Sequence, residues 1–172
     1  MRLRRYLMAC LMGAAGAVAA HDGTVNITGT IQDKTCEISP DSVNQSVPLG
    51  TVASKDLKDA GSATRAERFT IRLEQCGAAV SGASVSFSGT PDNTVPALVR
   101  LTALPGGATG LGVELLDDAM TAIPVQSSSH QYPIEPGTGS AVLVFYARYR
   151  ATGSGVTTGV ANASVTFTLT YA

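Results

Sequence analysis

The chain ends in ANASVTFTLTYA (residues 161–172), which carries the clearest β-strand pattern in the sequence. Its apolar residues Val165, Phe167, Leu169 and Tyr171 alternate with threonines. Because successive side chains of a strand point to opposite faces, this alternation predicts one apolar face and one polar face. Chain ends usually fray, so a strand this regular at the terminus is expected to have a partner that holds it.

Shorter runs of alternating residues recur from residue 25 onward, separated by clusters of Gly, Pro, Asn, Asp and Ser. This pattern is typical of an all-β protein built as an antiparallel sandwich or barrel. The polar stretch Lys55–Ala66 allows one helical turn, for which Ser54 is a candidate cap. The predicted strands are Val25–Ile31, Thr35–Ser39, Val47–Val52, Arg68–Leu73, Ser84–Ser88, Val99–Ala103, Leu111–Leu116, Ala141–Ala151 and Val165–Tyr171.

The N-terminus has the pattern of a secretory signal peptide. Arginines follow Met1 closely, and the uncharged, mostly apolar run Tyr6–Ala20 comes next. This run is too short to cross a bilayer as a helix. We expect cleavage after Ala20, with cleavage after Ala19 as the alternative, so that the exported chain begins at His21.

Charge and composition argue against two classes of partner. Without the arginines at positions 2, 4 and 5, nine basic residues stand against 13 acidic ones, a net charge of about −4. Such a chain does not attract nucleic acid or anionic lipid. No later apolar run is long enough for a transmembrane helix, so we expect no direct membrane insertion.

Residues with catalytic or metal-binding chemistry are few. Asp117 and Asp118 adjoin in a predicted turn, where paired aspartates are usually solvated. His130 stands in SSSHQY without the nucleophile elbow or strand–turn–helix context of a catalytic triad. The glycines of GATGLG (107–112) lack the preceding strand and following helix of a dinucleotide site. We therefore expect no enzyme activity, no cofactor and no metal site.

Cys36 and Cys76 are the cysteines that remain once Cys10 leaves with the signal. An even pair in an oxidising compartment predicts a disulfide. Closing a loop of this length stabilises the fold by about 4 kcal/mol in the chain-entropy description. The alternative, a zinc site, needs more ligands than His21 and His130 supply.

Several segments carry a resemblance through their order and spacing. They are VNITGTI (25–31), DKTCEI (33–38), VPLGTV (47–52), FTIRLEQC (69–76), VFYARYRAT (144–152) and GVANASVTFTLTYA (159–172). The last segment has a glycine fourteenth from the end, Gly159, and a next-to-last tyrosine, Tyr171. Together they resemble the subunits of chaperone–usher fimbriae, the type 1 pilin family, over essentially the whole exported chain.

The resemblance implies an immunoglobulin-like β-sandwich that lacks its final strand and leaves a groove open between two sheet edges. In the family, a periplasmic chaperone fills this groove with one of its strands. The N-terminal extension of the next subunit later replaces that strand, a form of β-augmentation. An unfilled groove exposes apolar surface and unpaired backbone groups, which favours aggregation.

The same resemblance implies the domain boundaries and partners. Residues 1–20 are then the signal peptide, residues 21–34 the donor-strand extension, and residues 35–172 the pilin domain. The expected partners are neighbouring fimbrial subunits, identical or related, the periplasmic chaperone and the outer-membrane usher. The expected destination is the cell surface, reached through the periplasm, where the fimbria supports cell adhesion.

The donor side chains implied by the resemblance are Val25, Ile27, Gly29 and Ile31, which share one face of an extended segment. Glycine inside a strand weakens it unless something must approach closely. Gly29 resembles the family's glycine that lies where the floor of the groove is shallow.

At the other end of the chain, the family's C-terminal strand forms one edge of the groove and is recognised by the chaperone. The implied recognition set here comprises Gly159, Val165, Phe167, Leu169, Tyr171 and Ala172. The carboxylate of Ala172 is expected to bind basic residues of the chaperone, a charge-assisted contact that sets the register of the strands.

Two questions stay open from the sequence. A self-contained secreted β-sandwich that binds sugar or protein is the alternative function. Within the pilin family, SVPLGTVASKDLKDAG (46–61) resembles major rod subunits, whereas VNITGTI (25–31) resembles minor adaptors, and a major pilin-like subunit is the expectation.

Overall fold

The computed structural model describes residues 28–29, 34–135, 137–153 and 155–172. The chain divides into two units, Met1–Ile31 and Gln32–Ala172, and the fold belongs to the second. The predicted signal peptide lies outside the described residues. So does the predicted strand Val25–Ile31, apart from Thr28 and Gly29, which are exposed.

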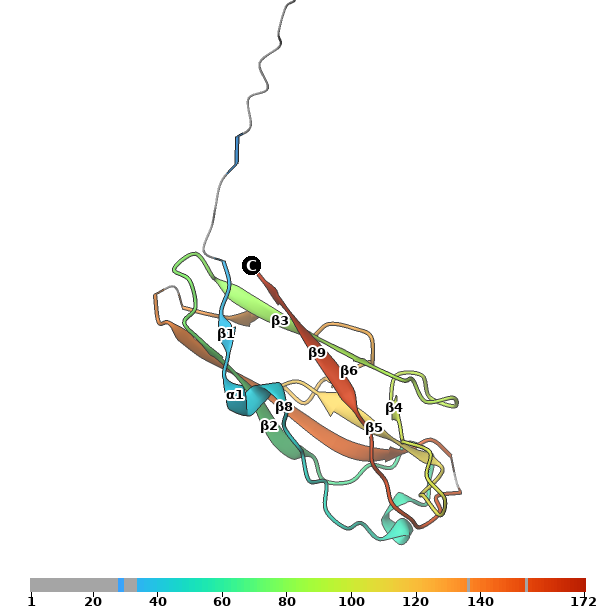
Figure 1. The fold of residues 1–172 in the computed structure, drawn as a ribbon. Helices are drawn as coiled ribbons and strands as arrows, with labels where there is room; N and C mark the ends of the chain where they lie inside the picture. The colour runs from blue at the N-terminus through green and yellow to red at the C-terminus, as the bar shows by residue number, and fades with distance from the viewer. Residues whose placement is uncertain (1–27, 30–33, 136, 154) are drawn as a thin grey trace, which may run out of the picture. The chain divides into compact units, whose positions relative to one another are not determined.

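The strands of the second unit form two antiparallel sheets (Figure 1). One sheet has the order β1-β2-β8-β5-β4, with β6 also paired to β5, and the other has the order β7-β3-β9. A short helix α1 (Pro40–Val43) and a 3-10 helix η1 (Ser54–Leu57) lie between β1 and β2 in the chain. The strands are β1 (Glu37–Ile38), β2 (Glu67–Glu74), β3 (Gly82–Gly89), β4 (Val99–Arg100), β5 (Leu111–Leu116), β6 (Ala122–Ile123), β7 (Tyr132–Pro133), β8 (Ser140–Ala151) and β9 (Val165–Tyr171).

The core lies between the two sheets and is built from their alternating inward side chains. Ile71 of β2 and Phe145 of β8 are fully buried on one side, and Val85 and Phe87 of β3 are buried on the other. The rings of Phe87 and Phe145 meet edge to face, with their centroids 5.2 Å apart. Aromatic pairs of this geometry add about 0.5–1.5 kcal/mol beyond the burial of their area.

Several predicted strands are confirmed. β5 and β9 have the predicted bounds, and β2, β3 and β8 extend one or two residues beyond theirs. The predicted strand Val99–Ala103 is shortened to β4. The predicted helical turn appears as η1, but Ser54 is its first residue and caps nothing, because the preceding Ala53 holds the cap position.

The predicted strand Val47–Val52 is wrong. Val47 and Leu49 pack against the core as alternation requires, but the backbone of this segment joins no ladder within the described residues. Alternating residues fit a half-buried surface, whereas a strand also needs a neighbouring edge with which to bond.

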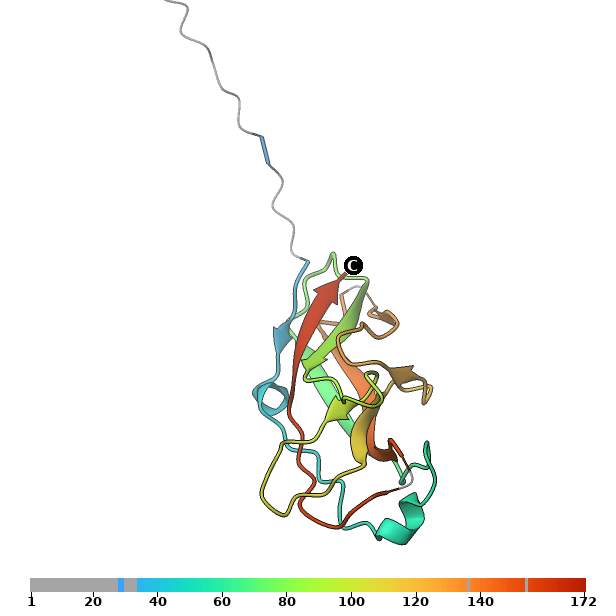
Figure 2. The ribbon, with the colours of Figure 1, turned by 90° about the vertical axis from the view of Figure 1, so that its right-hand side faces the viewer.

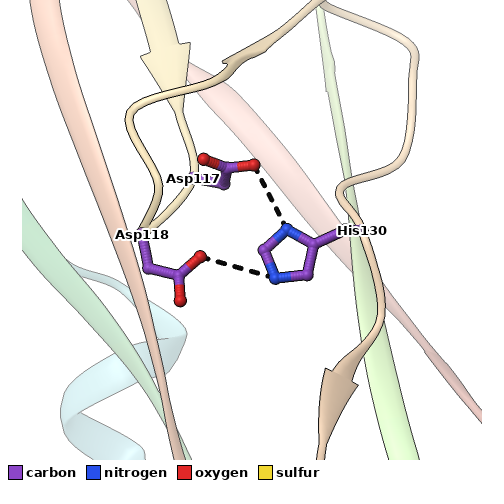
Figure 3. Close-up of side chains that lie close together, drawn as sticks. All are labelled: Asp117, Asp118 and His130. Atoms are coloured by element: carbon purple, nitrogen blue, oxygen red, sulfur yellow. Dashed lines mark hydrogen bonds and ion pairs between the residues drawn. The ribbon is translucent and has the colours of Figure 1, made fainter.

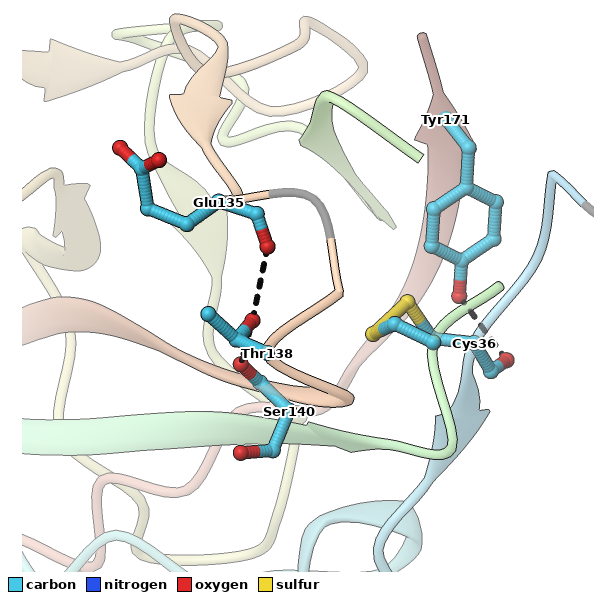
Figure 4. Close-up of a disulfide and its surroundings, with 6 residues drawn as sticks. Cys36, Glu135, Thr138, Ser140 and Tyr171 are labelled. Atoms are coloured by element: carbon cyan, nitrogen blue, oxygen red, sulfur yellow. Dashed lines mark hydrogen bonds between the residues drawn. A yellow bond between two sulfur atoms is a disulfide. The ribbon is translucent and has the colours of Figure 1, made fainter. Parts of the chain in front are cut away.

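The predicted disulfide between Cys36 and Cys76 is present (Figure 4). It joins the residue before β1 to the second residue after β2, and the amide of Gly77 donates to the carbonyl of Thr35 at 2.9 Å beside it. The disulfide therefore anchors the short edge strand β1, which pairs with β2 through only Glu37 and Ile38.

Among the described residues, no helix has both the length and the apolar character required to cross a membrane.

Candidate functional site

The C-terminal strand β9 is an edge strand whose apolar face is incompletely covered. It pairs with β3 alone within the described chain, and both views of the ribbon show it beside β3 (Figures 1 and 2). On β3, Val85 and Phe87 are 0% and 1% exposed. On β9, the inward residues Val165, Phe167, Leu169 and Tyr171 are all only half-buried. Two neighbouring strands of one sheet thus differ in burial because none of the described strands covers the outer side of β9.

Among the described residues, the backbone of β9 has no strand partner along the same side. The amide of Ala172 donates to the carbonyl of Gly82 at 2.9 Å, and bonded positions alternate along an antiparallel strand. The even-numbered residues of β9 therefore bond to β3, and the amides and carbonyls of its odd-numbered residues face away from β3. An edge of this kind is a template for another strand.

A groove of about 530 Å³ runs beside this edge. One wall is the segment that follows β1, from Ser42 to Leu49, and the other is the start of β9 with the residues that lead into it. The floor is apolar and comes from both sheets. Its residues are Phe69, Phe87, Val99, Val113, Leu115, Ala147 and Tyr149.

The wall after β1 is held by hydrogen bonds to β2. The hydroxyl of Ser42 accepts from the amide of Arg72 at 2.9 Å, and the side-chain amide of Gln45 donates to the carbonyl of Thr70 at 3.2 Å. These contacts take up backbone groups of β2 that a longer β1 would have bonded. The segment therefore runs along the groove without joining the sheet.

The opposite wall is held by Tyr149 of β8, whose hydroxyl donates to the carbonyl of Ala161 at 2.6 Å. Burial raises the pKa of the Tyr149 hydroxyl above its ordinary value, so it remains a donor at neutral pH. Sequence reasoning missed this role, because nothing in the sequence indicates that Tyr149 of β8 lies beside the residues that lead into β9.

The groove ends before the last residues of β9, and Phe167 is the last residue of the strand that lines it. The hydroxyl of Tyr171 donates to the backbone carbonyl of Cys36 at 3.2 Å, beside the disulfide (Figure 4). The terminal residue Ala172 accepts hydrogen bonds from the amide of Ser81 at 2.9 Å and from its hydroxyl at 3.1 Å. At this end the two sides of the sandwich are thus bridged, and neither Leu169 nor Tyr171 lines the groove.

The two predicted glycines have different surroundings. Gly29 has no atom within 4 Å of where a Cβ would stand, apart from its chain neighbours. Gly159 lies before β9, outside the groove lining, where a Cβ would overlap the backbone of residues 106–108. The position of Gly159 accordingly demands glycine for close packing against a neighbouring loop.

A model of the fimbrial protein family matches residues 25–172 of the chain. The chain belongs to the fimbrial protein family. It is 37% identical over 162 residues to the S-fimbrial protein subunit SfaG of Escherichia coli, which covers 94% of this chain and 87% of that protein. The members of this family are structural subunits of pili. This function takes the place of the alternative drawn from the sequence, a self-contained binding module.

Solved structures agree with this fold. A crystal structure of an antigen and type I fimbria protein of Burkholderia pseudomallei is 40% identical to the chain, with a TM-score of 0.63, and covers 81% of this chain and 91% of that one. A subunit in the structure of a chaperone–usher pilus matches with a TM-score of 0.66 at 24% identity, over 92% of this chain and 100% of that one. The two sheets of this fimbrial subunit are therefore the immunoglobulin-like pilin sandwich, and the protein is a component of a surface fibre built from fimbrial subunits.

One other predicted feature is corrected by the structure. Asp117, expected to be solvated, is only 6% exposed, and it lies beside Asp118 and His130 (Figure 3). The prediction failed because the turn after β5 packs against the segment before β7, a contact that the sequence does not reveal.

Proposed function

We propose that this fimbrial subunit polymerises by donor-strand exchange, in which residues 25–31 of one subunit enter the groove beside β9 of the next. The observation that carries the proposal is the half-buried apolar face of β9, next to a groove with an apolar floor. Its edge also carries backbone groups free to bond a further strand. An added strand covers the apolar face and hydrogen-bonds to the free backbone groups at the same time.

The donor segment has as many residues as the stretch on the β9 side of the groove. The groove lining includes residues from Ala161 to Phe167 along the β9 side, and residues 25–31 form a segment of the same length, about 23 Å when extended. Beyond Phe167, the hydrogen bond between Tyr171 and Cys36 bridges the sandwich, so a longer donor has no further groove to enter.

The chemistry of the donor also matches that of the floor. Val25, Ile27 and Ile31 present apolar side chains on one face of the segment, and each contributes about 1.5–3 kcal/mol when fully buried. Gly29 occupies the remaining position of that face. A side chain is absent there, which suits a place where the floor approaches the donor backbone closely.

We further propose the route by which the subunit reaches the fibre. Residues 1–20 direct export, residues 21–34 remain exposed as the donor, and residues 35–172 fold with the help of a periplasmic chaperone that occupies the groove until the usher passes the subunit to the fibre. The chaperone binds the face formed by Val165, Phe167, Leu169 and Tyr171 and pairs with the carboxylate of Ala172.

Donor-strand exchange is tested by Gly29→Leu, with Thr28→Leu as the matched control. Both substitutions add the same side chain, but on opposite faces of the donor segment. We expect Gly29→Leu to slow or prevent assembly and Thr28→Leu to assemble normally, as measured by electron microscopy and by the amount of subunit in sheared surface fibres. Normal fibres from Gly29→Leu would contradict the assignment of the donor face.

Chaperone recognition is tested by Tyr171→Ser, with Thr170→Ser on the opposite face of β9 as control. We expect Tyr171→Ser to weaken capture of the subunit by the chaperone and to lower its periplasmic level, because the apolar recognition face loses its last member. Equal yields of the two variants in a chaperone pull-down would count against the assignment.

A further inference from the structure

A cluster of potential metal ligands lies at the edge of the three-stranded sheet opposite the groove. Asp117 and Asp118 follow β5, and His130 precedes β7. The imidazole Nδ1 lies 3.2 Å from Oδ2 of Asp117, and Nε2 lies 3.4 Å from Oδ1 of Asp118. One ligand atom from each residue falls within 4.8 Å of the others, and Figure 3 shows the three side chains converging.

The Asp117 carboxylate is fixed before any ligand arrives. Its Oδ1 accepts from the amide of Thr121 at 2.7 Å, and the amides of Asp117 and Met120 close the turn through backbone bonds of 2.9 and 3.0 Å. Its other oxygen, Oδ2, faces the imidazole of His130. The carboxylate is therefore held in one orientation, with one oxygen directed at the other members of the cluster.

His130 is also oriented by its neighbours. Its ring lies on the ring of Tyr132, with centroids 4.2 Å apart, and the Tyr132 hydroxyl is anchored to the carbonyl of Val144 at 2.9 Å. The adjacent Ser129 is tied to β3, since it exchanges bonds of 2.8 and 3.0 Å with the backbone of Val85. A ring held from both sides loses little freedom when it binds an ion.

The carboxylates of the cluster differ from the buried carboxylate of Glu114 in the cationic groups around them. Glu114 has a side chain 4% exposed and is neutralised by Arg148 and Arg150. Asp117 has a side chain 8% exposed, yet within the described residues no Lys or Arg pairs with it or with Asp118. Two carboxylates therefore face one imidazole, without the pair of guanidinium groups that Glu114 has.

We propose that Asp117, Asp118 and His130 bind a divalent transition-metal ion, with Zn²⁺ as the ion that best fits the donors. In a tetrahedral site with bonds of about 2.0–2.2 Å, neighbouring ligand atoms lie about 3.3–3.6 Å apart. The distance between Nδ1 of His130 and Oδ2 of Asp117 already lies close to this value. Asp118 lies against the other ring nitrogen, so its 48% exposed side chain must turn toward an ion held by Nδ1 and Asp117.

The donor set and the exposure define what kind of ion site this is. An imidazole with two carboxylates favours Zn²⁺ and its first-row neighbours over Ca²⁺, which takes six to eight oxygens. Three protein ligands leave a fourth position open, and the half-exposed His130 and Asp118 make that position reachable from solvent. The ion would tie the β5–β6 turn of one sheet to the β7 segment of the other. The site is independent of the groove and of strand exchange.

The test is calorimetric titration of Zn²⁺ into the purified protein near neutral pH, with thermal melting in the presence and absence of the ion. We expect saturable binding of one ion per chain and a higher melting temperature with Zn²⁺. His130→Gln and Asp118→Asn should each weaken binding by about tenfold or more. Asp56→Asn removes an exposed carboxylate elsewhere and should leave binding unchanged, and so should His21→Ala, which removes the other histidine.

Circular dichroism of each variant establishes that it is folded, and Asp118 is exposed enough for its substitution to leave the fold intact. The absence of saturable Zn²⁺ binding by the folded wild-type protein would overturn the proposal. Binding that persists unchanged in both His130→Gln and Asp118→Asn, or that disappears in His21→Ala, would overturn it as well, because the ion would then lie elsewhere.

Discussion

Substitution of Tyr171 by Phe isolates the hydrogen bond that bridges the end of the groove. The ring keeps its packing against the core, and only the bond from the hydroxyl to the Cys36 carbonyl is lost. The net contribution of such a bond is about 0.5–1.5 kcal/mol. We therefore expect Tyr171→Phe to lower the free energy of unfolding by about 1 kcal/mol, which corresponds to about 3–5 °C in melting temperature for a domain of this size.

The same substitution has a pH signature. Burial raises the pKa of Tyr171 in the folded state above its ordinary value near 10. A raised folded pKa contributes stability that is fully present below the unfolded pKa and is lost as the pH rises through the folded pKa. The difference in unfolding free energy between wild type and Tyr171→Phe should accordingly be constant from neutral pH to about pH 10 and shrink above it.

Urea unfolding of purified subunits across this pH range measures both effects. Tyr146→Phe is the matched control, because the hydroxyl of Tyr146 has no hydrogen-bond partner within the described residues. Stability of Tyr171→Phe equal to that of wild type at neutral pH, or a difference that stays constant well above pH 10, would refute the role given to this hydroxyl.

Two further substitutions probe features away from the groove. Glu114→Gln removes the carboxylate that Arg148 and Arg150 share. Because those arginines are partly solvated, we expect the free energy of unfolding in urea to fall by about 2 kcal/mol. The control Glu74→Gln, at an exposed position, should change it little. Gly159→Ala forces a Cβ onto the backbone of residues 106–108 and should cost about 1–3 kcal/mol. Gly153→Ala, which has open space around it, should leave the melting temperature unchanged, and equal melting of the two alanine variants would contradict the packing argument.

The strands with a strictly alternating pattern were predictable, because the division of their side chains between an apolar and a polar face can be read from consecutive residues. β9 has the predicted bounds, with half-buried apolar residues and exposed threonines. The segment Val47–Val52 carries the same kind of pattern, yet it forms no strand. Its side chains alternate between core and solvent as predicted. A strand also needs a neighbouring strand with which its backbone can form hydrogen bonds, and only the tertiary structure determines whether one is present.

Polar residues in turns were predicted least well. Adjacent aspartates in a turn are usually solvated, but Asp117 is buried against His130. The two positions are 13 residues apart in the sequence, and the stretch between them contains the connection from one sheet to the other. No local pattern indicates that this connection brings a carboxylate and an imidazole together.

The sequence by itself determined the all-β class, the C-terminal strand, the disulfide pair and the membership of a fimbrial family, because these depend on local alternation, cysteine count and the order of motifs. Only the tertiary structure decided that the outer side of β9 is uncovered, that the segment after β1 leaves the sheet and lines a groove, and that Tyr171 closes the end of that groove. The physical reason is that burial and backbone pairing depend on which edges meet in space. Two strands with the same alternation, β3 and β9, differ in burial solely because one has a neighbour on each side and the other lies at an edge.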